Sequence, residues 1–319
     1  MIGGEIKVTV VIPVFNSGAF LSRCLDSVLQ QSLREIEVIC VNDCSSDQSA
    51  EILAEYQAKD GRVCVVHNAE NMGAGRCRNV GLNRAHGEYL LFLDSDDWLF
   101  PDGLEKVWAT AHRRRADILR CRALDYDNQT GKSSRSTHNG LKRVPPLLFD
   151  RATDYRRSCG VFAKVCVAPW GGLARCGFLQ EQGIFFNDLV CVNDRSFFWE
   201  TMLKAQCVVF TRDMLIHYRI GLSGSLVGGR VRNFSCHLES YRMVSGLCGG
   251  LPPAIQRRVL NSELLDIAHW VERGAETEYA GEIRLMVRQF LDTMDRSPWG
   301  GRIERTRWYR RIERVLGTR

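Results

Sequence analysis

Three carboxylates that directly follow an apolar run are the residues most suggestive of chemistry in this chain. Residues 90–98 read LLFLDSDDW, so Asp94, Asp96 and Asp97 come after four apolar residues of strand-like composition. Hard divalent cations such as Mg²⁺ and Mn²⁺ prefer carboxylate oxygens and often share them with the phosphates of a substrate. The segment therefore predicts a strand that ends in a metal-binding turn. A solvated acidic turn is the alternative for these residues taken alone.

Further polar turns follow the other apolar runs in the first third of the chain. The expected strands cover residues 7–14, 37–41, 63–66 and 89–93. They alternate with helical patterns, which predicts βαβ units and a mostly parallel sheet whose right-handed crossovers bring the strand ends to one edge. The turns that we expect to meet at this edge are residues 15–16, 42–43, 71–78 and 94–97. Open α/β folds bind their ligands at such an edge.

The composition is that of an ordinary globular protein. Of the 319 residues, 45% are hydrophobic and 25% are charged, and no apolar run approaches the roughly 20 residues that span a bilayer. The first residues do not resemble a signal peptide. The 13 cysteines are odd in number and none form a C-x-x-C pair, which indicates buried, reduced thiols. These observations predict a cytoplasmic protein.

The positive charge is concentrated at the C-terminal end. Residues 302–319 contain seven Arg and two Glu, a net charge of +5 out of +6 for the chain. A nearly neutral body does not predict a nucleic-acid groove, so no nucleic-acid partner is expected. The apolar residues that share one helical face of this tail are Trp308, Ile312, Val315 and Leu316. This pattern fits peripheral contact with an anionic membrane at its inner face, and equally a helix docked on its own domain.

Five motifs within residues 7–100, in this order and spacing, resemble glycosyltransferase family 2. They are VVIPVFN, CLDSV, VNDCSSD, NMGAGRCRNVG and GEYLLFLDSDDW. Members of this family are inverting enzymes of the GT-A fold that use nucleotide sugars. A weaker resemblance extends to about residue 226 through WGGL, NDRSFF, LIHYR and SGSL.

The resemblance implies a fold and a domain organisation. The expected class is α/β, with a GT-A (Rossmann-like), mostly parallel sheet flanked by helices and a helical C-terminal extension. We expect a glycosyltransferase domain at residues 1–230, with a nucleotide-sugar half at 1–100 and an acceptor half at 101–230. A helical region with the basic tail is expected at 231–319.

The resemblance also implies a nucleotide site at the ends of the first two strands. The residues expected to hold the base and ribose are Pro13, Val14, Phe15 and Asn16. Asp43 is expected to accept a hydrogen bond from a uracil N3–H, which favours a UDP-sugar. Asp43 could also serve only as a cap of the helix that follows it.

The donor's phosphates and sugar are expected at the third and fourth turns. Gly73 allows close backbone approach, and the helix that follows favours an anion at its N-terminus. Asn71 belongs to the same turn, and Arg78 is expected to reach the diphosphate or sugar. Asp94 and Ser95 are expected to contact the ribose or sugar.

The expected cofactor is Mn²⁺ or Mg²⁺. Asp96 is the expected direct ligand, and Asp94 shares the site. Asp97 is expected to orient its neighbours or to cap the next helix. His217, in LIHYR, is the third candidate ligand, although a histidine at a strand end is more often structural.

An inverting transfer needs a general base on the face of the sugar opposite the leaving group. The resemblance assigns this role to Asp194 in VNDRSFF, where Asn193 replaces the usual Glu. Asp194 could instead be only the N-cap of a helix at 195–204. Asp188 is the second candidate base.

Together these features predict an inverting, metal-dependent glycosyltransferase. It would move one sugar from a UDP-sugar to a glycan or lipid-linked acceptor in the synthesis of a surface polysaccharide or oligosaccharide. The change at Asn193 leaves a non-catalytic, nucleotide-sugar-binding scaffold as an alternative. A sugar nucleotidyltransferase is disfavoured because PVFNSGAF lacks a basic, glycine-rich loop. Trp170 could be a sugar platform or core, and residues 223–225 could belong to a lid.

Overall fold

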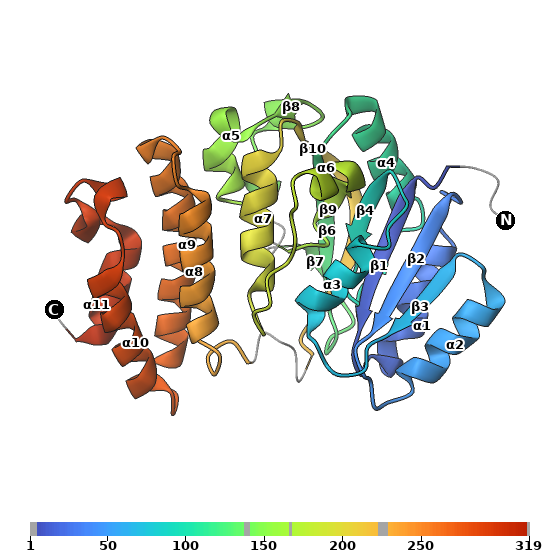
Figure 1. Ribbon diagram of the computed structural model, residues 1–319, viewed down its shortest axis with the longest axis horizontal. Helices are drawn as coiled ribbons and strands as arrows, with labels where there is room; N and C mark the ends of the chain where they lie inside the picture. The colour runs from blue at the N-terminus through green and yellow to red at the C-terminus, as the bar shows by residue number, and fades with distance from the viewer. Residues whose placement is uncertain (1–4, 137–140, 166–167, 223–228, 318–319) are drawn as a thin grey trace. The chain divides into compact units, whose positions relative to one another are not determined.

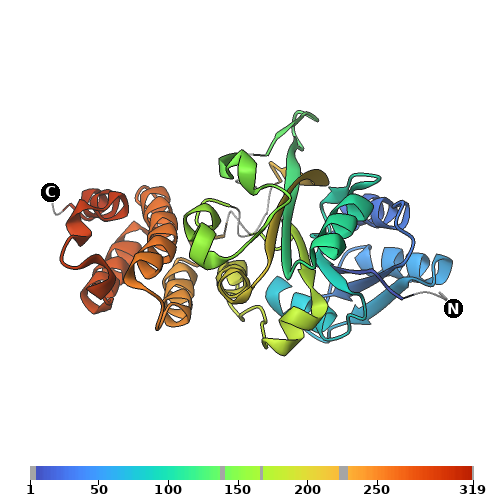
Figure 2. The same ribbon diagram turned by 90° about the horizontal axis from the view of Figure 1, so that it is seen from above.

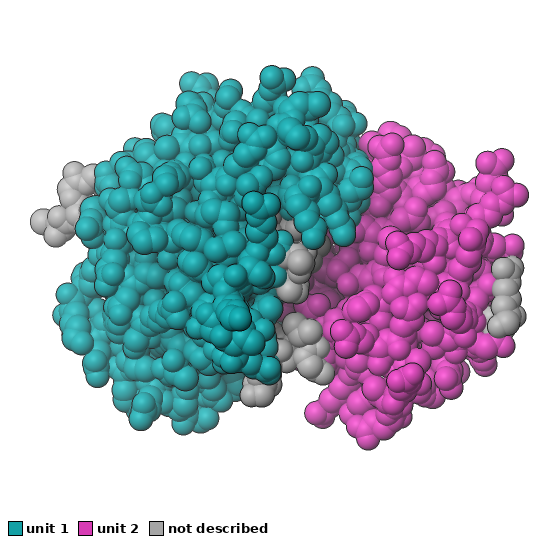
Figure 3. Space-filling view, turned by 180° about the vertical axis from the view of Figure 1, so that it is seen from behind, with its two compact units in different colours: residues 1–188, 200–222 teal, residues 189–199, 223–319 magenta. Residues whose placement is uncertain are grey.

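The computed structural model describes residues 5–136, 141–165, 168–222 and 229–317. The chain divides into two compact units (Figure 3). Met1–Asp188 and Glu200–Leu222 form the first, here called the α/β unit. Leu189–Trp199 and Ser223–Arg319 form the second, here called the helical unit. A short segment from the middle of the chain therefore packs with the C-terminal helices.

The strands described for the α/β unit form one ten-stranded sheet (Figure 1). The strands β3 (Val63–His67), β2 (Ile36–Asn42), β1 (Val8–Val14) and β4 (Tyr89–Phe92) lie side by side in this order and are parallel. The sheet continues through β9 (Gly172–Arg175), β6 (Ile118–Asp127), β10 (Val208–Ile220) and β5 (Trp98–Leu99). At its margins, β7 (Ser133–Arg135) pairs with β6 and β8 (Ala152–Thr153) pairs with β10.

Strand directions confirm an α/β fold with a largely parallel sheet. The strands β6 and β10 are parallel to each other and run in the same direction as the first four, because β9 is antiparallel to both β4 and β6. The strands β5, β7 and β8 are antiparallel to their neighbours. The predicted polar loop at 127–139 thus contains β7, a short strand that the sequence pattern does not indicate.

Helices cover both faces of β1, which explains why this strand is a nearly continuous apolar run. Alternate residues from Val8 to Val14 join one core with α1 (Gly18–Leu29), α2 (Ser49–Lys59) and α4 (Gly103–Arg114). Val11 points to the other face, where α3 (Ala74–Leu82) packs. A Cβ added at Gly81 of α3 would lie 2.3 Å from Val11 Cγ1, so this helix lies very close to the sheet.

The remaining helices complete the two units. The α/β unit also holds α5 (Tyr155–Phe162) and α6 (Cys176–Glu181), and α7 (Asn193–Lys204) begins in the helical unit. In the helical unit α9 (Pro253–Gly274) packs against α8 (Ser235–Leu247), α10 (Ala280–Thr293) and α11 (Arg307–Leu316) (Figure 2). Single 3₁₀ turns occur at Leu141–Arg143, Pro146–Leu148, Ser297–Trp299 and Ile303–Arg305.

The apolar face of the basic tail is buried inside the helical unit. Trp308, Ile312 and Leu316 are at most 8% exposed. The indole Nε1 of Trp308 donates to Asn261 Oδ1 at 3.0 Å, which fixes α11 on α9. Of the two interpretations of this tail, docking on its own domain describes the apolar face. Any contact with a membrane would have to use the arginine side.

Two other sequence expectations concern cysteines and membrane spans. Cys44 and Cys64 are exposed, so the expectation of buried thiols is wrong for these two, and Cys166 lies outside the described residues. Both exposed thiols lie beside apolar neighbours in the sequence, but neighbours along a strand point to opposite faces. Across the described part of the chain, no helix combines the length and apolar character needed to cross a bilayer.

Candidate functional site

The turn after β1 is fastened to the turn after β2. Asn16 has a φ of 49°, a left-handed conformation that Asn tolerates better than most residues. Its side-chain Oδ1 accepts from the backbone N–H of Ser46 at 2.8 Å, and its own N–H donates to Ser45 Oγ at 3.1 Å. Phe15 is 50% exposed, whereas Val14 is fully buried. Val14 can therefore contribute to a ligand site only through its backbone.

Asp43 connects the end of β2 to the glycine-rich turn before α3. Its carboxylate accepts from the backbone N–H groups of Met72 at 2.8 Å and Gly73 at 2.7 Å, and from Asn68 Nδ2 at 2.8 Å. It therefore holds the third turn and does not cap the helix that follows it in sequence. A carboxylate has about four acceptor positions, so these three donors leave one.

The glycine-rich turn is shaped by Gly73, which has a φ of 84° and immediately precedes α3. Glycine adopts this left-handed conformation without the strain that a Cβ causes. Asn71 is exposed beside it. The first backbone N–H groups of α3 have no partner within the helix, which makes this end suited to an anion.

The turn after β4 is bound to two of the other turns. Arg78 of α3 donates from Nη2 to Asp94 Oδ1 at 2.6 Å, and the arginine is only 6% exposed. The hydroxyl of Ser95 lies 2.7 Å from that of Ser17, at the start of α1. These bonds, with those of Asn16 and Asp43, bring all four predicted turns together at the carboxyl ends of parallel strands.

Asp96 and Asp97 carry excess negative charge. Burial, and secondarily repulsion from Asp94, raises the pKa of Asp96 to about 6. Burial and repulsion from Asp96 and Asp94 hold the pKa of Asp97 well above its usual range. Asp97 Oδ1 accepts from the backbone N–H of Arg219 at 2.8 Å, whereas its Oδ2 is buried and has no hydrogen-bond partner in the described part of the chain. Asp97 thus orients this turn and does not cap α4.

Arg219 at the end of β10 belongs to this site, although the sequence patterns did not identify it. Its Nε donates to the backbone oxygen of Asp96 at 2.9 Å. Its guanidinium lies over the rings of Phe20 and Trp98, at 4.6 and 4.9 Å from their centroids. Burial lowers the pKa of Arg219. The one local signal was an arginine two residues after His217 in LIHYR.

The acidic turn fits a divalent cation. Its donors are carboxylate oxygens, one of which is buried without a partner, and the raised pKa of Asp96 shows that the positive charge nearby is insufficient. No group of three or more metal-ligating side chains is already gathered around one point in the described residues. Mg²⁺ is commonly held by one or two carboxylates together with substrate phosphates, and this arrangement needs no such cage.

His217 lies in an aromatic stack. Its ring is 4.8 Å from that of Trp98 and 3.9 Å from that of Phe100. Burial, with a smaller contribution from Arg23, lowers its pKa to about 4, so the imidazole is neutral at pH 7. Its Nδ1 is buried, with no hydrogen-bond partner among the described residues. A neutral imidazole is the form that binds metals.

Trp170 belongs to the core. It is 3% exposed and stacks on Tyr218 at 4.7 Å, which excludes it as an open platform for a sugar in this structure. The lid expected at 223–225 lies outside the described residues.

The first candidate base, Asp194, lies in the first turn of α7. The helix begins at Asn193, so Asp194 is not the residue that precedes it. Val192, two residues earlier, has a φ of 54°. This conformation is strained for a β-branched residue, and such strain is concentrated at functional sites. Asp194 is carried by the helical unit.

The second candidate base, Asp188, has a less suitable environment. It forms an exposed ion pair in which Arg76 Nε lies 3.0 Å from Asp188 Oδ1. Hydrogen bonding from Arg76 lowers the pKa of this carboxylate. A carboxylate of lowered pKa is a weaker base.

Comparison with known proteins assigns the chain to a family. The model of glycosyl transferase family 2 matches residues 9–167. The chain is 31% identical over 237 residues to the putative glycosyltransferase EpsH of Bacillus subtilis, a match that covers 73% of this chain and 67% of that protein.

Two solved structures share the fold over almost the whole chain. S. aureus TarS 1–349 in complex with UDP-GlcNAc superposes with a TM-score of 0.68 at 21% identity, covering 98% of this chain and 92% of that one. The mannosyltransferase PcManGT from Pyrobaculum calidifontis, in complex with GDP-Man and Mn²⁺, has a TM-score of 0.58 at 14% identity, covering 99% and 85%. With its four polar turns at one sheet edge, the fold and the sequence lead to one conclusion: this chain is a glycosyltransferase and belongs to glycosyltransferase family 2.

Proposed function

We propose that the protein transfers one sugar, with inversion, from a UDP-sugar to a glycan or lipid-linked acceptor in the synthesis of a surface polysaccharide or oligosaccharide. The observation that carries this proposal is the joining of the four polar turns through Asn16, Asp43, Arg78 and Ser95. A similar fold binds UDP-GlcNAc in TarS, which supports a donor of this class.

The proposed donor site follows the order of the turns. Pro13, Phe15 and Asn16 hold the base and ribose, with Val14 setting the end of the strand. The fourth acceptor position of Asp43 receives the uracil N3–H.

The sugar and diphosphate lie along the other two turns of the proposed site. Asn71 and Gly73 form the turn that approaches the diphosphate at the start of α3. Arg78, Asp94 and Ser95 contact the sugar or ribose.

The proposed metal ligands are Asp96 and Asp94, with His217 as the third candidate. Mn²⁺ or Mg²⁺ would supply positive charge to balance the charge on the departing nucleoside diphosphate. The support from this chain is the buried, unpartnered Oδ2 of Asp97 and the raised pKa of Asp96.

On the acceptor side, we propose Asp194 as the general base. It takes the proton from the acceptor hydroxyl as the bond to the anomeric carbon forms, and attack from that side inverts the configuration. The amide of Asn193 is neutral, so Asp194 has one fewer negative neighbour than the Glu-Asp pair that it resembles. The strained backbone at Val192 supports a functional role for this turn.

Calorimetric titration with a panel of nucleoside diphosphates and UDP-sugars, in Mn²⁺ and in EDTA, tests this function directly. We expect UDP to bind only with the metal, and one UDP-sugar to be slowly hydrolysed to UDP. Preferential binding of GDP would contradict the role given to Asp43. Absence of binding by any nucleotide would contradict the enzyme and favour the scaffold.

We further propose a cytoplasmic location at the inner face of an anionic membrane. The contact would be electrostatic, through the arginine side of the tail. A hollow of about 530 Å³ is lined by Glu272, Arg305, Arg307, Arg310, Arg311 and Arg314. Arg311 pairs with Glu272 through a 2.8 Å hydrogen bond, which leaves an excess of positive charge around the hollow.

Changing Arg307 and Arg310 together to Gln is expected to weaken binding to vesicles that contain anionic phospholipid by at least tenfold at low salt. Each basic residue near such a surface contributes about 1 kcal/mol, so two charges account for this effect. Vesicle sedimentation measures it. Changing Arg113 and Arg114 to Gln, two exposed residues in the last turn of α4, removes the same charge and serves as the control. Equal loss in both variants, or no binding by the parent, would contradict the proposal.

A further inference from the structure

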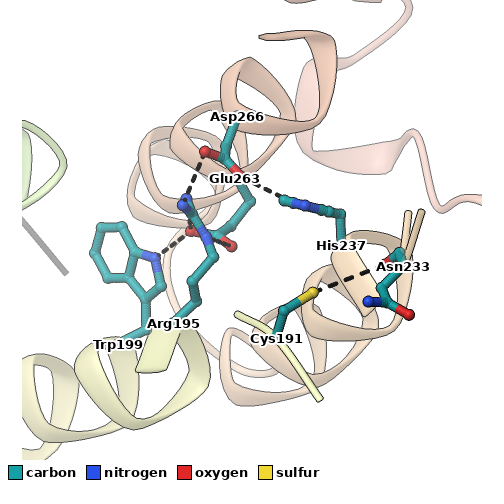
Figure 4. Close-up of polar contacts among 7 residues, drawn as sticks. All are labelled: Cys191, Arg195, Trp199, Asn233, His237, Glu263 and Asp266. Carbon is teal, nitrogen blue, oxygen red and sulfur yellow. Dashed lines mark hydrogen bonds and ion pairs between the residues drawn. The ribbon is translucent and has the colours of Figure 1, made fainter. Parts of the chain in front are cut away.

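The first turn of α7 is held by ion pairs buried in the helical unit (Figure 4). Arg195 donates from Nε and Nη2 to the two carboxylate oxygens of Glu263 on α9, each at 2.7 Å. Its Nη1 lies 3.2 Å from Asp266 Oδ1, one turn further along the same helix. Glu263 is only 2% exposed. A bidentate pair of this kind fixes orientation as well as distance.

Glu263 holds a second point of α7. The indole Nε1 of Trp199 donates to Glu263 Oε1 at 2.7 Å. Trp199 lies four residues after Arg195, so one carboxylate grips two successive turns of the same helix face. Figure 4 shows both side chains reaching the same carboxylate from α7.

The charges of this cluster are balanced within the helical unit. His237 of α8 places its Nδ1 3.1 Å from Asp266 Oδ2. Burial alone would raise the pKa of Asp266, but Arg195 and His237 hold it well below its usual range. Burial likewise opposes the charge of Arg195, whereas Asp266 and Glu263 raise its pKa. Arg195 and Asp266 therefore remain ionised inside the structure.

The backbone on the other side of Asp194 is also fixed. Val192 has its strained φ of 54°, and such a conformation persists only where the surroundings impose it. Asn193 Nδ2 donates to the backbone oxygen of Leu189 at 3.3 Å, and Cys191 Sγ lies 3.8 Å from the backbone oxygen of Asn233. Asp194 thus lies between a pinned loop and the Arg195–Glu263 pair.

We propose that Glu263 is a positioning residue for sugar transfer: through Arg195 it fixes the first turn of α7 and so the direction of the Asp194 carboxylate. This inference rests on the proposed role of Asp194 as the base. A general base must lie within hydrogen-bond reach of the proton that it removes, and a small displacement lowers the rate strongly. The C-terminal helices then contribute to catalysis, beyond extending the fold.

Glu263→Gln is the variant to test first. The amide keeps the size of the side chain but loses the charge and the bidentate acceptor geometry that Arg195 requires. We expect kcat per folded enzyme to fall at least tenfold, while the dissociation constant for UDP in Mn²⁺ stays within twofold of the parent. Glu263→Asp, which keeps the charge and shortens the side chain, is expected to lower kcat in the same direction.

Glu272→Gln is the matched control. Glu272 lies on the same helix and receives a similar two-point contact, from Arg311 of α11, without any contact to α7. Its loss is expected to lower the thermal midpoint of unfolding and leave kcat per folded enzyme unchanged. Folded enzyme is counted by UDP titration, so a purely structural effect cannot appear as a change in kcat.

The outcomes separate this inference from the function on which it rests. Unchanged kcat per folded enzyme in both Glu263→Gln and Glu263→Asp overturns the positioning role, whatever happens to their stability. If one variant does not fold, the other decides. Asp194→Asn is measured in parallel. Full transfer by Asp194→Asn removes the proposed base itself, whereas its loss beside normal Glu263 variants removes only the positioning role.

Discussion

Asp194→Asn is expected to lower the rate of sugar transfer by about 10² to 10⁴-fold, the usual contribution of a general base, while UDP binding is unchanged. The amide has the size of the carboxylate and no capacity to take the acceptor's proton. Asn is also tolerated in the first turn of a helix, so α7 should form normally. Transfer is measured as acceptor-dependent release of UDP, and binding is measured by calorimetry in Mn²⁺.

Asp188→Asn is the control for this prediction. It removes an exposed carboxylate whose partner is Arg76, and an exposed ion pair contributes little to stability. We expect less than a twofold change in transfer. Retained transfer in Asp194→Asn, or a large loss in Asp188→Asn, would place the base elsewhere.

Asp96→Asn is expected to abolish metal-dependent UDP binding and, at the same time, to stabilise the metal-free protein. The loss of a carboxylate ligand explains the first effect, which should exceed a hundredfold in affinity. The second follows from the pKa of Asp96, which is raised from 3.8 to about 6 in the folded protein. Since the folded state binds this proton more tightly, stability falls as the pH rises from about 4 to about 6 and stays lower above that range.

The expected gain in free energy of unfolding at pH 7.5 is about 2 kcal/mol, since each unit of pKa shift corresponds to about 1.4 kcal/mol. Thermal unfolding at pH 5 and pH 7.5, with EDTA and with Mn²⁺, measures it. The gain should be smaller at pH 5 and absent relative to a Mn²⁺-loaded parent.

Asp102→Asn is the control for the Asp96 prediction. Asp102 is a fully exposed carboxylate whose pKa is lowered by a hydrogen bond from Lys106, so no gain is expected there. Undiminished Mn²⁺-dependent UDP binding by Asp96→Asn would contradict the metal site.

Much of the α/β unit was determined by the sequence itself. The run from Val8 to Val14 had to be buried on both faces, and the structure places it between α3 and the α1 layer. Because parallel strands joined by helices bring their carboxyl ends to one edge, the polar turns could be expected to meet before any contact was known. The bonds from Asp43 to Gly73 and from Arg78 to Asp94 confirm that meeting.

The sequence pattern was less informative after Leu99 because the sheet is completed there by strands from distant segments. The antiparallel strand β9 is an example: a Cβ at Gly172 would lie 1.8 Å from the backbone oxygen of Leu119, so only glycine permits the pairing with β6. That glycine reads as an ordinary turn signal in the sequence. The core position of Trp170 was similarly ambiguous, since burial of an isolated aromatic depends on which elements pack over it.

Tertiary structure alone decided which charged residues support the site. Arg219 reaches Asp97 across 122 residues, and Arg195 reaches Glu263 across 68. Neither arginine differs from an ordinary surface arginine in local pattern, because spacing along a helix or strand encodes which face a residue occupies and not which partner it meets. The sequence therefore determined the strands, the turns and the family, whereas long-range packing chose the arginines that position the carboxylates.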